Sequence, residues 1–109
     1  MPRGGPGARA DGGLIMAPME PRYLISHHTE GTLPFATRRY ALAYIRARMG
    51  CARSYESESF EGTYVHPVDG TVSAEAVCVY PSPSARKADE TGAFAWHLAD
   101  LRTASKGEY

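Results

Sequence analysis

The most regular pattern of apolar and polar positions lies between residues 32 and 50, which read TLPFATRRYALAYIRARMG. At about 100° per residue, this segment gathers a set of large apolar side chains on one side: Phe35, Leu42, Ile45 and Met49. Thr32 suits a helix N-cap, Pro34 suits a first helical turn, and Gly50 suits a left-handed end. We therefore predict one main helix over residues 32–50, and we expect the rest of the chain to pack around it.

Three segments have the apolar and polar pattern of strands: residues 22–26, 54–66 and 71–80. Asp69-Gly70 lies between the last two and tolerates positive φ angles, so we predict a two-residue hairpin loop there. This loop puts Tyr64 on the same face as Glu75 and Val77. Both faces of the predicted hairpin are partly apolar. Since the helix can cover only one, we expect the other to meet the N-terminal segment or a partner.

The segment over residues 94–102 fits two structures. Phe94, Trp96 and Leu98 alternate as in a strand, whereas Phe94, Leu98 and Leu101 also fit one face of a helix. We favour the strand because the aromatic residues have even spacing. The predicted fold class is α+β, with one main helix packed on a small antiparallel sheet in the order β-α-β-β and then β or α.

Residues 1–13, MPRGGPGARADGG, are rich in glycine and proline. Such a segment buries too little apolar surface to offset the entropy of ordering it, so we predict a flexible N-terminal arm. Its Arg3 and Arg9 could add to a partner contact. Residues 14–109 are predicted to form a single α+β domain, in keeping with a length of 109 residues.

The predicted helix carries a second stripe of small and aromatic residues, roughly opposite the first: Ala36, Tyr40, Ala43, Tyr44 and Ala47. Either the same chain covers this stripe, or solvent does, or it binds a partner. Tyrosine and arginine are enriched where proteins bind partners. We therefore predict a partner-binding surface on this helix, formed by Arg39, Tyr40, Tyr44 and Arg46.

Charge is segregated along the chain although the formal net charge is +0. The arginine-rich helix, with Arg53 beyond it, contains no acidic residue, and the following hairpin is acidic. These charges either pair with one another or give the molecule a basic and an acidic face. A nucleic-acid-binding protein that uses the arginines of this helix is therefore an alternative interpretation, against which the neutral composition argues.

No residues are assigned a catalytic role, and no metal or cofactor is predicted. Adjacent His27 and His28 point to opposite sides of an extended chain, and nothing in the spacing brings His66 or His97 to them. A small metal-dependent enzyme that uses these histidines is a second alternative. Cys51 and Cys78 show no CxxC or zinc pattern, so we interpret them as small buried residues.

The favoured function is that of a small non-enzymatic protein-binding or regulatory protein. The N-terminus lacks an apolar core of signal-peptide length and no segment is long enough to span a membrane, so we expect a cytoplasmic protein without a membrane partner. A protein partner of unknown identity is expected. A nucleic-acid partner and a homodimer stay open as alternatives.

Overall fold

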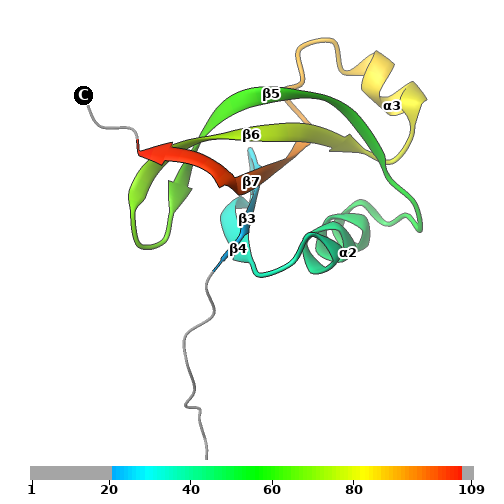
Figure 1. The fold of residues 1–109 in the computed structure, drawn as a ribbon. Coiled ribbons are helices and arrows are strands. Elements are labelled where there is room, and N and C mark those ends of the chain that lie inside the picture. The colour runs from blue at the N-terminus through cyan, green and yellow to red at the C-terminus, as the bar shows by residue number, and fades with distance from the viewer. Residues whose placement is uncertain (1–20, 107–109) are drawn as a thin grey trace, which may run out of the picture.

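The structure is a computed structural model that describes residues 21–106, so the predicted arm over residues 1–13 lies outside the described part. Its body is one five-stranded antiparallel sheet with the strand order β4-β3-β7-β6-β5 (Figure 1). The strands are β3 (Tyr23–His27), β4 (Gly31–Phe35), β5 (Tyr55–His66), β6 (Gly70–Tyr80) and β7 (Trp96–Lys106). The helices are α2 (Arg38–Met49) and α3 (Pro83–Ala88).

The predicted α+β fold, organised around one main helix, is wrong. The three long strands have 12, 11 and 11 residues, whereas α2 has 12 residues and α3 has 6. At a rise of about 3.3 Å per residue in a strand and 1.5 Å in a helix, each long strand extends about twice as far as α2. The helices are therefore short additions to a fold that the sheet determines.

The main helix begins six residues later than predicted, at Arg38 instead of residue 32. Thr37 is the N-cap, and its hydroxyl accepts a hydrogen bond from the Tyr40 N–H at 3.2 Å. Thr32 and Pro34 lie in β4, which pairs with β3 on one side and is an edge strand. Proline has no N–H to donate, and it is tolerated in a strand at the edge of a sheet. The Thr32 and Pro34 pair that resembles a helix start is therefore also compatible with this edge strand.

Two hairpin turns have the same design. His27 pairs with Gly31 and His66 pairs with Gly70, so three residues form each loop, and both glycines are left-handed, with φ of 76° and 77°. A three-residue loop that is followed by a left-handed residue is a common hairpin connection. The predicted two-residue loop at Asp69-Gly70 is therefore wrong.

This difference in the loop reverses the predicted face of β5. Tyr64 pairs with Val72 and Phe60 pairs with Ala76, and both aromatic side chains pack with the apolar residues of that face. A shift of one residue in register moves every side chain of a strand to the other face. The aromatic residues of β5 thus lie opposite the face that carries Val77.

The sheet has an apolar cluster on each face. On one face, α2 covers a core of large side chains, here called the helix-side core: Ile25, Ala41, Leu42, Ile45, Val79, Trp96 and Leu98. The other face is lined mostly by small residues, here called the alanine-side core: Leu24, Tyr64, Val72, Ala74, Ala76 and Ala99. Burial of both sets of apolar surface stabilises the fold.

The alanine-side core is covered by the curl of the sheet itself. The Cα atoms of β5 come within 8 Å of those of β3 and β4, although β6 and β7 lie between them in strand order. The long β5–β6 hairpin arches over the shorter strands (Figure 1). The face that was expected to meet the N-terminal segment or a partner is therefore closed, in the described part, by strands of the sheet.

Gly62 allows the aromatic side chain at the centre of this curl to lie flat on its own strand. A Cβ atom at Gly62 would meet the hydroxyl oxygen of Tyr64 at 2.2 Å and the adjacent ring carbon at 2.6 Å. Tyr64 is only 4% exposed. The absent side chain at Gly62 thus leaves the space that the Tyr64 ring occupies.

Several local predictions are confirmed. Residues 22–26 correspond closely to β3. The ambiguous segment over residues 94–102 forms the favoured strand from Trp96 onward, in β7, and Gly50 ends α2 with φ of 73°. Helix α3 was not predicted from the sequence, although Ser82 caps it and Pro83 follows. None of the helices described over residues 21–106 has the length and apolar character needed to cross a bilayer.

Candidate functional site

The outer face of α2 is open. Tyr40 is 65% exposed, and Arg39, Ala43 and Ala47 are exposed beside it. At about 100° per residue, these four positions span roughly a third of the helix circumference. Ala41, Leu42 and Ile45 lie on the buried side. The described residues therefore leave one face of the helix uncovered, which removes the alternative that the same chain covers it in this part of the structure.

Tyr44, predicted as part of that surface, is half-buried at its margin. Its ring lies 5.5 Å from the Phe35 ring and 6.1 Å from the Trp96 ring, measured between centroids. Its hydroxyl donates to a Glu30 carboxylate oxygen at 3.4 Å. Tyr44 therefore belongs mainly to the helix-side core, and Tyr40 is the aromatic residue that faces outward.

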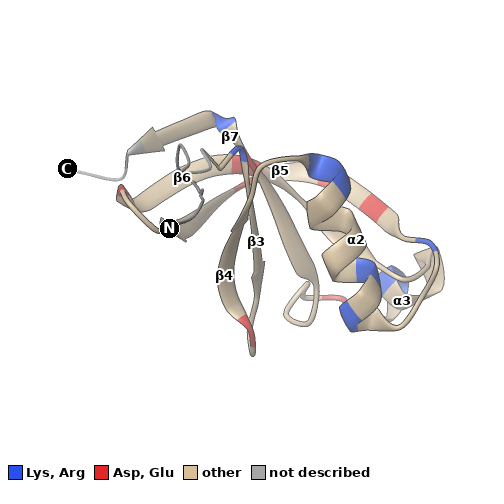
Figure 2. Cartoon of the chain, turned by 90° about the horizontal axis from the view of Figure 1, so that it is seen from below, with Lys and Arg blue, Asp and Glu red and all other residues tan. Residues whose placement is uncertain are grey.

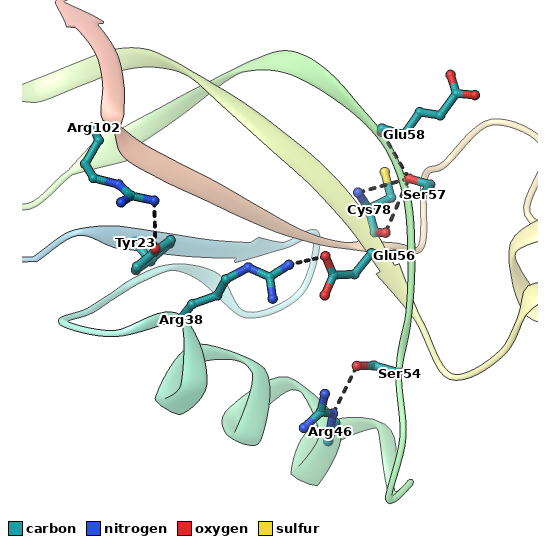
Figure 3. A network of polar contacts seen from close by, with 9 residues as sticks. All are labelled: Tyr23, Arg38, Arg46, Ser54, Glu56, Ser57, Glu58, Cys78 and Arg102. Atoms are coloured by element: carbon teal, nitrogen blue, oxygen red, sulfur yellow. Dashed lines mark hydrogen bonds and ion pairs between the residues drawn. The ribbon is translucent and has the colours of Figure 1, made fainter.

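The arginines of α2 mostly bind the chain itself, as Figure 3 shows for two of them. Arg46 Nε donates to the Ser54 hydroxyl at 3.0 Å, and Arg38 forms an ion pair with Glu56 at the start of β5. Arg48 forms an ion pair with Glu30 in the β3–β4 turn, so it too is engaged. Figure 2 shows basic positions along α2 and acidic positions on β5, an arrangement that favours mutual pairing.

The arginine-rich helix is therefore corrected: of the two alternatives for its charges, mutual pairing or a basic face, the structure favours pairing. Within the described residues, Arg39 is the α2 arginine that forms neither a hydrogen bond nor an ion pair. The exposed ion pairs hold α2 to β5 and to the β3–β4 turn, and each contributes at most about 1 kcal/mol. Of the four predicted contact residues, the structure leaves Arg39 and Tyr40 outward and turns Tyr44 and Arg46 partly inward.

Two of the histidines cap hairpin turns. Nδ1 of His66 accepts the N–H groups of Val68 at 3.0 Å and Asp69 at 2.9 Å. Nδ1 of His27 accepts the Thr29 N–H at 3.3 Å. Both turns follow the pattern His-x-x-acid-Gly, which the sequence shows but which was not recognised. These histidines have a structural role in their turns.

His97 lies on the alanine-side face and contacts Tyr64. The Tyr64 hydroxyl lies 3.2 Å from His97 Nδ1, and the His97 ring stands edge-on to Phe60 with centroids 5.0 Å apart. Burial, with a smaller contribution from the charge of His27, lowers the pKa of His97. Burial raises the pKa of Tyr64 to about 12. Both groups are therefore neutral near pH 7, and one hydrogen bond joins the hydroxyl to the imidazole.

A pocket opens beside this pair, where the end of β3, the curled β5 and the start of β7 meet. It encloses about 280 Å³. Its lining contains histidines, hydroxyl side chains and small residues: Ser26, His27, His28, Thr63, Tyr64, Gly92, Ala93, Ala95 and His97. The sequence did not predict it, because its members come from segments up to about seventy residues apart.

The histidines do not assemble a metal site in the described structure. Over residues 21–106, no group of three or more His, Cys, Asp or Glu side chains could hold a metal ion. Cys51 and Cys78 are free and half-buried, and burial raises the pKa of the Cys78 thiol. A buried thiol with a raised pKa is a poor nucleophile near pH 7. This geometry gives the enzyme alternative no support.

Comparison of the chain with protein-family models, with curated proteins and with solved structures finds no match. Functional arguments for this protein therefore rest on its own residues.

Proposed function

We propose that this protein is a non-enzymatic protein-binding module whose contact surface is the outer face of α2, defined by Arg39, Tyr40, Ala43 and Ala47. The observation that carries this proposal is the exposure of Tyr40, at 65%, beside an arginine without an internal partner. Large aromatic residues on a soluble domain usually pack inward, as Tyr44 does one turn later. Tyr40 instead points to solvent.

The four residues have the properties of a small interface centre. The Tyr40 side chain has few rotatable bonds and offers an apolar ring and a hydroxyl. The planar guanidinium of Arg39 can donate hydrogen bonds to a carboxylate. Ala43 and Ala47 let a partner approach the helix closely. We therefore expect a partner with an apolar recess for the Tyr40 ring and an acidic side chain opposite Arg39.

The surroundings favour rigid presentation of this face. Thr37 and Gly50 cap the two ends of α2, and the bonds from Arg38, Arg46 and Arg48 hold the helix to neighbouring segments. A rigid element loses little conformational entropy on binding, which favours affinity. Arg46, which was predicted as a contact residue, thus supports the surface from its side together with Arg38 and Arg48.

The experiment places a photo-crosslinking amino acid at position 40 of the full chain in its native host. We expect covalent capture of a specific partner from position 40, and loss of that capture when Arg39→Glu is added. The matched control carries the crosslinker at Val68, which is 82% exposed on the β5–β6 turn, with Lys87→Glu as its charge reversal. Equal capture from both positions, or no effect of Arg39→Glu, contradicts the proposal.

The same experiment can also show whether the captured partner is a second copy of this chain. Sedimentation of the purified protein at increasing concentration detects a homodimer, and a crosslinked species of twice the chain mass identifies α2 as its interface. If the purified protein remains monomeric, the captured partner must be a different protein.

A further inference from the structure

We propose that the partner of the α2 surface is a second copy of this chain, whose groove at the start of its own α2 receives the Tyr40 ring while its Glu75 pairs with Arg39. This inference rests on the proposed function, because it names the partner of the same surface. Two observations support it. The groove has the apolar floor and the carboxylate that the α2 surface requires, and it lies close enough to Tyr40 for two copies to contact each other reciprocally.

The groove lies on the helix-side face of the sheet, next to the first turn of α2. It encloses about 290 Å³, and its lining includes residues of β3, α2, β5, β6 and β7: Tyr23, Arg38, Ser59, Glu75, Val77 and Leu98. Leu98 belongs to the helix-side core and Val77 packs against it, so both give the groove an apolar floor. Figure 3 shows the Arg38 guanidinium directed toward Glu56, which neutralises this wall. The groove thus offers an apolar surface and the Tyr23 ring for contact with an incoming aromatic ring.

Three carboxylates on adjacent strands make this part of the sheet face negative. Glu75 on β6 pairs directly with Glu61 on β5 and with Asp100 on β7, so the three side chains lie in a row on one face. Like charges directly opposite one another destabilise a sheet. Arg102 bonds twice to Asp100 and neutralises it. The Glu75 carboxylate accepts a hydrogen bond from the Ser59 hydroxyl at 3.1 Å but has no cationic partner in the described part of the chain. Glu75 therefore favours a cation from another molecule.

The α2 surface has the complementary properties. Arg39 carries a positive charge that no described residue neutralises, and the neighbouring Tyr40 is 65% exposed. On a second copy, the Tyr40 ring would lie on the apolar floor of the groove, and the Arg39 guanidinium would donate to the Glu75 carboxylate. Each side of the contact thus supplies the charge that the other lacks, which is the electrostatic complementarity that favours specific association.

The position of the groove allows this contact to form twice in one dimer. Arg38 lines the groove, and Tyr40 lies two residues later on the same helix. α2 covers only part of the helix-side face, since three residues farther along β5 on that face are exposed: Glu61, Thr63 and Val65. Figure 1 shows the long strands extending beyond α2. When two copies face each other, the helix of one therefore lies over the uncovered sheet of the other, and such a reciprocal contact closes after two copies.

The experiment measures self-association of the purified full chain by sedimentation equilibrium. We expect a monomer–dimer equilibrium that weakens as the salt concentration rises, because salt screens exposed ion pairs. Arg39→Glu and Glu75→Arg should each raise the dissociation constant of the dimer by at least about tenfold, since each places two pairs of like charges in the interface. Both residues are exposed, so both variants should fold, and circular dichroism checks this.

Exchange of the two charges tests the pairing itself. The double variant Arg39→Glu/Glu75→Arg restores both pairs of opposite charges, as does an equimolar mixture of the two single variants, so both samples should dimerise again. The matched control is Glu58→Arg, at an exposed position of β5 outside the groove, which should leave the dissociation constant unchanged and should not rescue Arg39→Glu. Failure of the exchange to restore the dimer, or equal effects of Glu75→Arg and Glu58→Arg, overturns the proposal.

These measurements also separate the dimer from the proposed function. A chain that stays monomeric while the crosslinker at position 40 captures a different protein overturns the dimer and keeps the α2 surface as a binding site. A monomer without any capture from position 40 removes both. A dimer in which position 40 does not crosslink to residues of the groove overturns the assignment of the groove, and assembly beyond the dimer contradicts the reciprocal contact.

Discussion

The two faces of the sheet are closed in different ways. The helix-side core uses large side chains, with Ile25, Ile45 and Leu98 at 4% exposure or less, beneath a separate element. The alanine-side core uses Ala74, Ala76 and Ala99, over which the same sheet curls. Small side chains allow backbones to approach closely, whereas large ones hold a helix at a distance. The size of the side chains on each face thus indicates whether a helix or another part of the sheet can pack against it.

This comparison explains why the second face needs no external partner. A flat hairpin with two apolar faces leaves one uncovered, and this was the basis for expecting a partner there. The curl places Tyr64 over the alanines, and Gly62 leaves room for its ring. The outer face of α2 stays uncovered in the described part, and a pocket opens at the edge of the curl.

The largest effect is expected from truncating the helix-side core. Ile45→Ala removes a side chain with 0% exposure from the contact between α2 and the sheet, and it should lower the free energy of unfolding by about 2–5 kcal/mol. Chemical denaturation measures the change. Ala43→Ser, on the outer face of the same helix, should stay within about 0.5 kcal/mol of the wild type.

A somewhat smaller loss is expected from closing the space at Gly62. Gly62→Ala puts a Cβ atom 2.2 Å from the Tyr64 hydroxyl oxygen, so the ring must leave its position over the alanines. Overpacking of this kind destabilises by about 1–3 kcal/mol. Denaturation of Gly62→Ala and of the neighbouring Thr63→Ala compares the two sites. Equal stability of both variants would mean that the Tyr64 ring does not pack over Gly62.

The Tyr64–His97 hydrogen bond should contribute less. Tyr64→Phe keeps the ring and removes the hydroxyl, so we expect a loss of about 0.5–1.5 kcal/mol. A double-mutant cycle with His97→Gln separates the pairwise contribution from the individual ones. Additive effects of the two substitutions would contradict a direct contact.

The smallest expected effect concerns pH. Burial lowers the pKa of His97 in the folded state, so the unfolded chain binds more protons in the window below pH 6.5. Stability is therefore complete above pH 6.5 and falls as the pH drops towards the lowered value. His27, whose pKa is lowered by burial and then by His28, adds to the same trend. His97→Gln should flatten the slope of stability against pH, and an unchanged slope would assign it to other groups.

Local features of the fold were predictable because short segments determine them. The buried face of α2 follows from the spacing of Leu42 and Ile45, and its end follows from Gly50. The start of the helix was not predictable from this pattern, since Thr32 and Pro34 suit a helix terminus and an edge strand alike. The pairing of β4 with β3 decides between them, and that pairing depends on the three-residue turn that joins the two strands.

The residues of the candidate sites also divide into those that a single segment determines and those that contacts between elements determine. The outward positions of Arg39 and Tyr40 follow from helix geometry alone, whereas the inward position of Tyr44 depends on Phe35 and Trp96, which belong to other elements. The pocket beside His97 depends on the curl of β5, which follows from the register of the β5–β6 hairpin. Recognition of the repeated His-x-x-acid-Gly pattern would have indicated three-residue loops and hence the correct face for Tyr64.

The most direct test of the curled sheet is the nuclear Overhauser effect between the ring protons of Tyr64 and His97 in the free protein. The ring centroids lie 5.9 Å apart and the bonded atoms 3.2 Å apart, although β6 separates their strands in the sheet. We predict a clear cross-peak that is retained in Tyr64→Phe and lost in Gly62→Ala. The absence of this cross-peak in the folded wild-type protein would contradict the account.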